Sequence, residues 1–231
     1  WAEYSRFMGD IFGAPLALEA LMAFFLESTF MGVWIFGWGR LSNKAHATVA
    51  TLVALGTNLS AFWILVANSF MQHPVGYVIR NGRAEMENFA TIVSNGYVPG
   101  QFAHIVLNGS MTAGVIIMAI SAWHLIRKSN VDFYKTSVKW GMVITLIAGT
   151  LGAFAGHHQG QYITKEQPMK MAAMEALWDT QDPAPFSLVA NIDTKAQQNT
   201  GAIEIPGGLS FLTQNSFTSG KVEGIKDLQA K

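Results

Sequence analysis

Long tracts without charged side chains constrain the fold of this chain more than any other feature. Asp, Glu, Lys and Arg are all absent from residues 46–78, 88–126 and 140–164. Each tract can supply the about 20 apolar residues that a helix needs to span a bilayer. A fourth apolar tract, residues 11–38, carries only Glu19 and Glu27 as charged residues. Buried core helices of a large soluble protein are the alternative interpretation, and four such tracts in so short a segment argue against it.

The sequence therefore predicts an all-α membrane protein, whose four transmembrane helices belong to a larger helical bundle. The expected spans lie near residues 11–38, 47–71, 101–126 and 140–156. We expect residues 1–156 to form the transmembrane region and residues 157–231 to form an extracytoplasmic segment. The chain begins with Trp rather than Met, and we expect it to be an internal piece of a longer protein.

Composition excludes several classes of protein. The 15 basic and 15 acidic side chains cancel, which argues against a nucleic-acid binder that works through a basic surface. The chain contains no cysteine, so disulfides, thiol catalysis and zinc–thiolate sites are excluded. Half of the residues are hydrophobic, which argues against intrinsic disorder.

Basic residues in the short loops predict the orientation in the membrane. Loops 39–46 and 127–139 carry an excess of Lys and Arg, whereas the charges of loop 72–99 balance. Basic loops remain cytoplasmic. We therefore expect loops 39–46 and 127–139 to be cytoplasmic, and loop 72–99 and the segment 157–231 to be extracytoplasmic.

The segment after the last span has one clear helix signal. Thr164 and Gln167 have the Thr-x-x-Gln spacing of a capping box, which predicts a helix start there. We expect this helix to continue to about Trp178, before the proline-containing run 183–186.

Glu19 and Glu27 are the strongest candidates for chemistry, because ionisable residues inside a span usually face a protein interior or a water cavity. On a regular α-helix, residues eight apart lie about 80° apart around the axis and about 12 Å apart along it. One interior face can hold both carboxyl groups at two depths, which suits a proton path, and Ser28 adds a hydroxyl beside Glu27. The alternative is a structural ion pair with Arg or Lys from other helices.

Several further polar residues allow two interpretations. His104, near the outer end of the third span, is either a hydrogen-bonded interior residue or an axial haem ligand. Asn58, Ser60 and Asn68 in the second span either bond between helices or line a proton route. For Lys170 and Glu175, a solvated position is the simpler interpretation. The same holds for the histidines near span ends and in the loop, namely His46, His73, His124, His157 and His158.

The chain resembles subunit I of the cytochrome bd quinol oxidases along nearly its whole length. The longest matching runs are 9–19 and 22–30. Shorter ones are 36–38, 54–56, 58–61, 63–68, 102–104, 120–123, 170–175 and 183–186. The resemblance implies a quinol:oxygen oxidoreductase of the bacterial or archaeal cell membrane, with two b haems, a haem d, subunit II and a further small single-span subunit.

The resemblance also implies roles for individual residues. His104 is similar to the axial ligand of the low-spin b haem, and Glu19 and Glu27 to two carboxylates on the proton route. Ser60 is similar to a serine of a proton path, and Lys170 and Glu175 to a quinol-linked pair in the extracytoplasmic loop.

Parts of the family pattern have no counterpart in this sequence. The family's first helices, its later helices and their haem ligands are not found here, so we expect four of about nine spans. A proton-coupled transporter or channel fragment that uses Glu19 and Glu27 without haem is the main alternative function. A membrane subunit without cofactor is a third.

Overall fold

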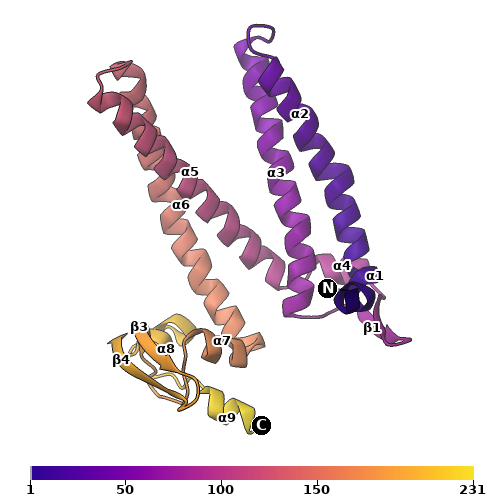
Figure 1. Ribbon diagram of the computed structural model, residues 1–231, viewed down its shortest axis with the longest axis vertical. Coiled ribbons are helices and arrows are strands. Elements are labelled where there is room, and N and C mark those ends of the chain that lie inside the picture. Colours follow the sequence, from indigo (N-terminus) through magenta and orange to yellow (C-terminus); the bar gives the residue numbers. More distant parts are fainter. Residues whose placement is uncertain (1) are drawn as a thin grey trace. The chain divides into compact units, whose positions relative to one another are not determined.

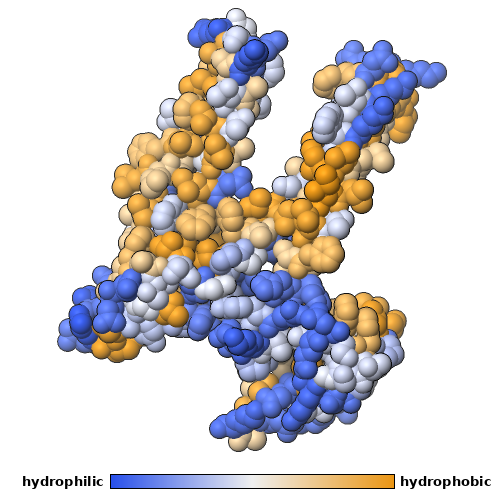
Figure 2. All heavy atoms as spheres, turned by 180° about the vertical axis from the view of Figure 1, so that it is seen from behind, coloured by the Kyte–Doolittle hydropathy of each residue, from blue (hydrophilic) through white to orange (hydrophobic). Residues whose placement is uncertain are grey.

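The computed structural model describes residues 2–231, and most of them are helical (Figure 1). Within that range, four helical segments are long and apolar enough to cross a membrane: Ala2–Phe36, Asn43–Gln72, Tyr97–Ile126 and Val131–Glu166. These segments confirm the predicted all-α fold class. Figure 2 shows hydrophobic side chains over the shafts of the long helices and hydrophilic ones at their ends. Such an apolar surface is suited to lipid or to other helices rather than to water.

The chain divides into two compact units, the first ending at Val106 and the second running from Leu107 to Lys231. In the first unit, one long helical segment comprises α1 (Ala2–Leu18), the π-helix η1 (Glu19–Phe24) and α2 (Phe25–Phe36), and α3 (Asn43–Gln72) returns beside it. The Ser42 hydroxyl caps α3 by accepting from the Ala45 N–H at 3.3 Å. The helix α3 therefore starts slightly earlier than the predicted span.

The predicted loop 72–99 contains regular structure. Strands β1 (Tyr77–Arg80) and β2 (Arg83–Met86) form an antiparallel hairpin, and the short helix α4 (Phe89–Val93) follows. Asn81 and Gly82 both have positive φ at the hairpin turn, a conformation that suits this residue pair. The Asp10 carboxylate accepts from the Met86 N–H at 2.7 Å and so ties the hairpin to α1.

In the second unit, α6 (Val131–Glu166) packs against α5 (Tyr97–Ile126) through small residues. A Cβ added to Gly114 would lie 2.9 Å from the Gly141 carbonyl oxygen, and one added to Gly141 would lie equally close to the Gly114 oxygen. Gly152 meets Asn108 further along the same pair of helices. Small residues at such contacts let helix backbones approach closely in a membrane.

After α6 the chain forms a small folded segment with its own core. It contains α7 (Pro168–Met174), the antiparallel strands β3 (Phe186–Asp193) and β4 (Gln198–Ile205), α8 (Gly208–Gln214) and α9 (Ile225–Gln229). The core consists of Met171, Leu177, Ala184, Leu209 and Val222.

The predicted capping box at Thr164 is wrong. The helix α6 runs through this position to Glu166, and the Thr164 hydroxyl donates to the Gly160 carbonyl oxygen of its own helix at 2.9 Å. Pro168 provides the break, because it cannot donate a backbone hydrogen bond but suits the first position of a helix. The helix α7 begins there and ends at Met174 rather than at Trp178.

Candidate functional site

Glu19 has a direct partner on the neighbouring helix. The Ser60 hydroxyl of α3 donates to Glu19 Oε1 at 2.7 Å. Both residues are half-buried, and the bond joins residues 41 positions apart in the chain. The structure thus brings together two of the predicted proton-path residues.

Glu27 lies at a close approach of α2 and α3. A Cβ added to Gly56 would lie 2.9 Å from the Glu27 backbone nitrogen. Gly56 and Ser60 are four residues apart, so they share one face of α3. That face therefore meets Glu27 at one turn and Glu19 at the next.

Ser28 is directed to its own helix. Its hydroxyl donates to the Phe24 carbonyl oxygen at 2.7 Å. A small surface hollow of about 300 Å³ at the junction of η1 and α2 is lined by Phe24, Glu27, Ser28 and Met31. Glu27 and Ser28 thus share a hollow that neither Glu19 nor Ser60 lines.

The π-helix η1 changes the predicted geometry of the two carboxylates. It begins at Glu19 and ends at Phe24, so most of the segment between Glu19 and Glu27 is not α-helical. A π-helix has wider turns than an α-helix, with i→i+5 bonds. The predicted angle of about 80°, which assumed a regular α-helix, therefore does not hold. Such π turns occur frequently at functional sites.

His104 is half-buried on α5, one turn after a polar network that joins α5 to α3. Gln101 Nε2 donates to Asn68 Oδ1 at 3.2 Å, and Gln101 Oε1 accepts from the Ser69 hydroxyl at 3.0 Å. Asn95 extends the network by donating to the Ser69 and His73 carbonyl oxygens. The network fixes the start of α5 and hence the place of His104. Asn68 thus bonds between helices, one of the two interpretations open from the sequence, and no spacing in the sequence indicates Gln101 as its partner.

Several of the other histidines pack against aromatic rings. His46 lies with ring centroids 6.1 Å from Trp34 and 4.3 Å from Trp38, and its Nε2 bonds the Trp34 carbonyl oxygen at 2.8 Å. His124 stacks on Tyr134. His157 Nε2 bonds Asn215 Oδ1 at 2.7 Å, which links α6 to the end of α8.

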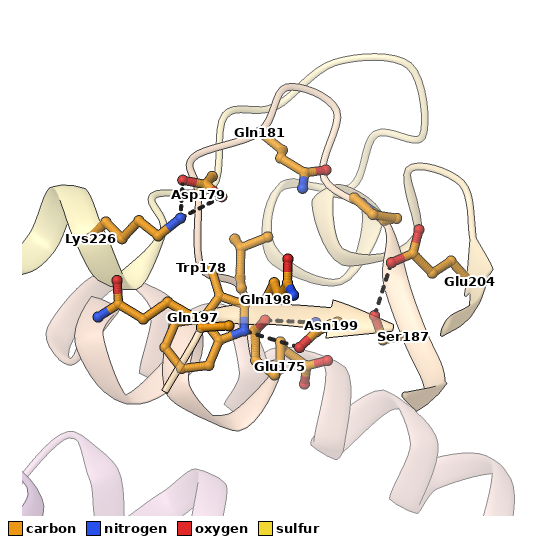
Figure 3. A pocket seen from close by; sticks show the side chains of 14 residues that line it. Glu175, Trp178, Asp179, Gln181, Ser187, Gln197, Gln198, Asn199, Glu204 and Lys226 are labelled. Atoms are coloured by element: carbon orange, nitrogen blue, oxygen red, sulfur yellow. Dashed lines mark hydrogen bonds and ion pairs between the residues drawn. The ribbon is translucent and has the colours of Figure 1, made fainter. Parts of the chain in front are cut away.

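Glu175 lies in a polar hollow of about 340 Å³ in the segment that follows α6 (Figure 3). Its neighbours there include Trp178, Asn199, Glu204 and Lys226. Lys226 donates to both Asp179 oxygens, at 2.8 and 3.0 Å, at the rim. Burial raises the pKa of the Glu175 carboxyl above its ordinary value of 4.5, because desolvation disfavours the charged form.

Lys170 lines a different hollow. Its neighbours come from the end of α6, from α7 and from α9, and include Glu166, Met169 and Leu228. The structure thus places Lys170 on α7 and Glu175 directly after its end, and the two side chains line different hollows.

Comparison with known proteins decides the family. The family model for cytochrome bd terminal oxidase subunit I matches residues 1–231. The chain belongs to this family. It is 49% identical to the cytochrome bd ubiquinol oxidase subunit 1 of Bacillus subtilis (strain 168), over the whole chain and 49% of that relative. It is 44% identical to the cytochrome bd-II ubiquinol oxidase subunit 1 of Escherichia coli (strain K12), over the whole chain and 45% of that relative.

A solved structure agrees with the sequence relatives. The fold matches a bd oxidase structure from Geobacillus thermodenitrificans with a TM-score of 0.86 and 29% identity, over 99% of this chain and 52% of that one. The chain spans about half the length of the relatives it matches. With its four long apolar helices, this cytochrome bd subunit I chain is a membrane protein, and the relatives named here are bacterial.

Proposed function

We propose that this chain forms part of a terminal oxidase that oxidises quinol at the outer membrane face and reduces oxygen to water with cytoplasmic protons. The single observation that carries the proposal is the match of the subunit I family over every residue of the chain. Both relatives named above are ubiquinol oxidase subunits.

We propose His104 as the axial ligand of a low-spin b haem. Residues 2–231 contain no group of three or more His, Asp and Glu side chains that could hold a metal ion. A haem needs no such group, because the porphyrin supplies four nitrogens and the protein supplies one or two axial ligands. A half-buried imidazole on a membrane helix fits that donor set. Two b haems and a haem d would supply electron transfer and oxygen binding when bound.

Glu19, Glu27, Ser28 and Ser60 are assigned to proton delivery. The Ser60 hydroxyl donates a hydrogen bond to Glu19 Oε1, so it holds the carboxyl group at a fixed depth of the bundle. If loops 39–46 and 127–139 are cytoplasmic, Glu27 is nearer the cytoplasm than Glu19, and a proton from inside meets Glu27 first. A carboxyl group in such a place can take up and release a proton during turnover.

Lys170 and Glu175 are assigned to quinol oxidation. The hollow around Glu175 is polar and lies outside the spans, and burial favours the neutral form of its carboxyl group. A carboxyl with a raised pKa can accept a proton from quinol and release it to the outer aqueous phase. Lys170, in its separate hollow, would contact a different part of the quinol or its surroundings.

The whole enzyme requires more than this chain. We assign subunit II, a small single-span subunit and the lipid bilayer as partners, with no nucleic acid. We place residues 157–231 outside a bacterial or archaeal cell membrane, and keep residues 1–156 as the transmembrane domain.

The test is a reduced-minus-oxidised visible spectrum and quinol-dependent oxygen uptake of the purified full-length oxidase. We expect haem bands and activity in the wild type. The His104→Ala variant should lose or convert the low-spin b haem while oxygen binding at haem d survives. Absence of all haem bands from the wild-type complex would refute the proposal that the chain belongs to an oxidase. An unchanged low-spin band in the variant would show that a residue other than His104 is the axial ligand.

A further inference from the structure

The backbone directly after Glu175 has an unfavourable conformation. Ala176 has a φ of 48°, in the left-handed region, where the Cβ of a non-glycine residue is crowded. Residues held in this way persist only where their surroundings determine them, and they cluster at functional sites. Ala176 is buried at 8% exposure, so the surroundings of this turn are protein.

Backbone bonds at the end of α7 close this turn, from the Ala176 N–H to the Ala173 carbonyl oxygen at 3.3 Å and from the Leu177 N–H to the Ala172 carbonyl oxygen at 2.9 Å. A side chain from β4 then anchors the turn to the sheet. Asn199 Nδ2 donates to the Ala176 carbonyl oxygen at 3.0 Å, and Asn199 Oδ1 accepts from Trp178 Nε1 at 3.0 Å. The amide thus bridges the residues one and three positions after Glu175. Its own position is fixed by the sheet, where Asn199 pairs with Ile192 of β3.

Asn199 and Trp178 line the same hollow as Glu175 (Figure 3). We propose that Asn199 is a positioning residue for the Glu175 carboxyl in quinol oxidation, acting by holding the left-handed turn at Ala176. This inference rests on the proposed function of Glu175. Sequence spacing gives no sign of it, because the contact joins residues 23 positions apart in the chain.

The position of this turn affects the chemistry of the carboxyl group. Glu175 has a raised pKa because it is partly desolvated. If the turn relaxes, the carboxyl reaches water more easily and its pKa falls toward 4.5. The ionisation of Glu175, and with it the acid side of the pH profile for quinol oxidation, then moves to lower pH.

The experiment measures oxygen uptake by the purified full-length oxidase with decylubiquinol, across pH, for Asn199→Ala. The matched control is Asn191→Ala, which removes an exposed amide from the same hairpin. That amide donates to the Thr200 hydroxyl at 3.3 Å. We expect Asn199→Ala to lose about fivefold or more in kcat/KM, the size of one net hydrogen bond, and to shift the acid limb of the pH profile to lower pH. Haem spectra and oxygen uptake with a donor that reduces the haems directly should stay as in the wild type.

A second variant separates positioning from folding. Glycine adopts the left-handed conformation without a steric cost, so Ala176→Gly combined with Asn199→Ala should recover part of the lost activity. Wild-type kinetics and pH profile in Asn199→Ala, or a loss accompanied by haem loss and not recovered by the glycine, would overturn the inference. Glu175→Gln serves as the reference: wild-type quinol kinetics in that variant would refute the proposed role of Glu175 itself.

Discussion

At the scale of single residues, the bond between Ser60 and Glu19 gives the proton path a physical basis. The two side chains lie on different helices and meet at 2.7 Å. A typical hydrogen bond contributes about 0.5–1.5 kcal/mol net, so this contact fixes the position of the Glu19 side chain. The hydroxyl can also pass a proton, because it donates and accepts.

We expect Ser60→Ala to slow proton uptake by the full-length oxidase about 3- to 10-fold, because a loss of about 1 kcal/mol corresponds to roughly that factor. The measurement is flow-flash kinetics of proton uptake on enzyme with normal haem content. Ser60→Thr keeps the hydroxyl and serves as the control, with near wild-type rates. Equal rates of proton uptake in the wild type and in Ser60→Ala would show that the serine is not part of the proton path.

Glu175 gives a prediction about pH. Because its pKa is raised in the folded protein, the folded state holds the proton more tightly than the unfolded state does. The stability that this proton contributes is fully present below pH 4.5, the ordinary value of the carboxyl group, and is lost as pH rises through the raised pKa. Thermal unfolding of the segment 157–231, followed in the intact protein, should therefore become easier as pH rises through that window.

Glu175→Gln should flatten this dependence, since the amide does not titrate. Glu204→Gln, on the exposed end of β4 in the same hollow, is the matched control and should leave the pH dependence in place. Identical pH profiles for wild type and Glu175→Gln would show that another group causes the change.

At the scale of elements, glycines decide how closely the long helices pack. Gly56 brings α3 to the backbone of Glu27, and Gly114 brings α5 to Gly141 on α6. In a membrane, helix pairs associate through packing rather than through the hydrophobic effect. The positions of the carboxylates therefore depend on residues that carry no chemistry.

We expect Gly114→Ala to destabilise the protein by about 1–3 kcal/mol, because the new methyl group meets the Gly141 carbonyl oxygen and the Thr145 side chain. Gly109→Ala, on the same helix, is the control, because a Cβ added there meets no atom within 4 Å. Thermal unfolding in detergent of the two variants measures the difference. If both variants unfold at the same temperature, the close approach of α5 and α6 is not required.

The π-helix is an element-scale feature that propensity does not show. Its sequence, Glu19 to Phe24, contains no proline or glycine. The neighbouring helix supplies the contacts that compensate for the irregular turn, because η1 packs against α3 and Glu19 bonds Ser60. Packing between elements thus overrides the regular helix that the sequence favours.

At the scale of the whole molecule, the orientation in the membrane is the least constrained property and the easiest to test. The chain has no cysteine, so single cysteines can be introduced without background. Asn43→Cys and Lys135→Cys should be protected from an impermeant thiol reagent in intact cells, while Glu87→Cys and Thr218→Cys should be labelled. All four positions are exposed in the structure. Labelling of the Asn43 variant before cell lysis would show that the orientation is the opposite of the one proposed. The proposed direction of proton entry would then be wrong as well.

The sequence by itself determined the class of the fold, with its four long apolar helices. Burial in lipid depends on the composition of about 20 consecutive residues, so the absence of charges from residues 46–78 or 140–164 is sufficient to predict a helix there. The same local logic identified Glu19, Glu27 and His104 as candidates, because polar groups stand out in an apolar segment. Where local signals were weak, as at Thr164, the prediction failed, because a threonine inside a helix and one at its start have the same sequence signature.

Tertiary structure decided which of these residues act together. Ser60 meets Glu19 across 41 residues of chain, and Asn199 meets Ala176 across 23. Glu175 and Lys170, only five residues apart, line different hollows. Such contacts depend on how helices and strands pack, which is set by the sum of many side-chain volumes rather than by any local pattern. The left-handed turn at Ala176 combines both scales, since local backbone bonds close the end of α7 and a hydrogen bond from a distant strand anchors a conformation that alanine disfavours in isolation.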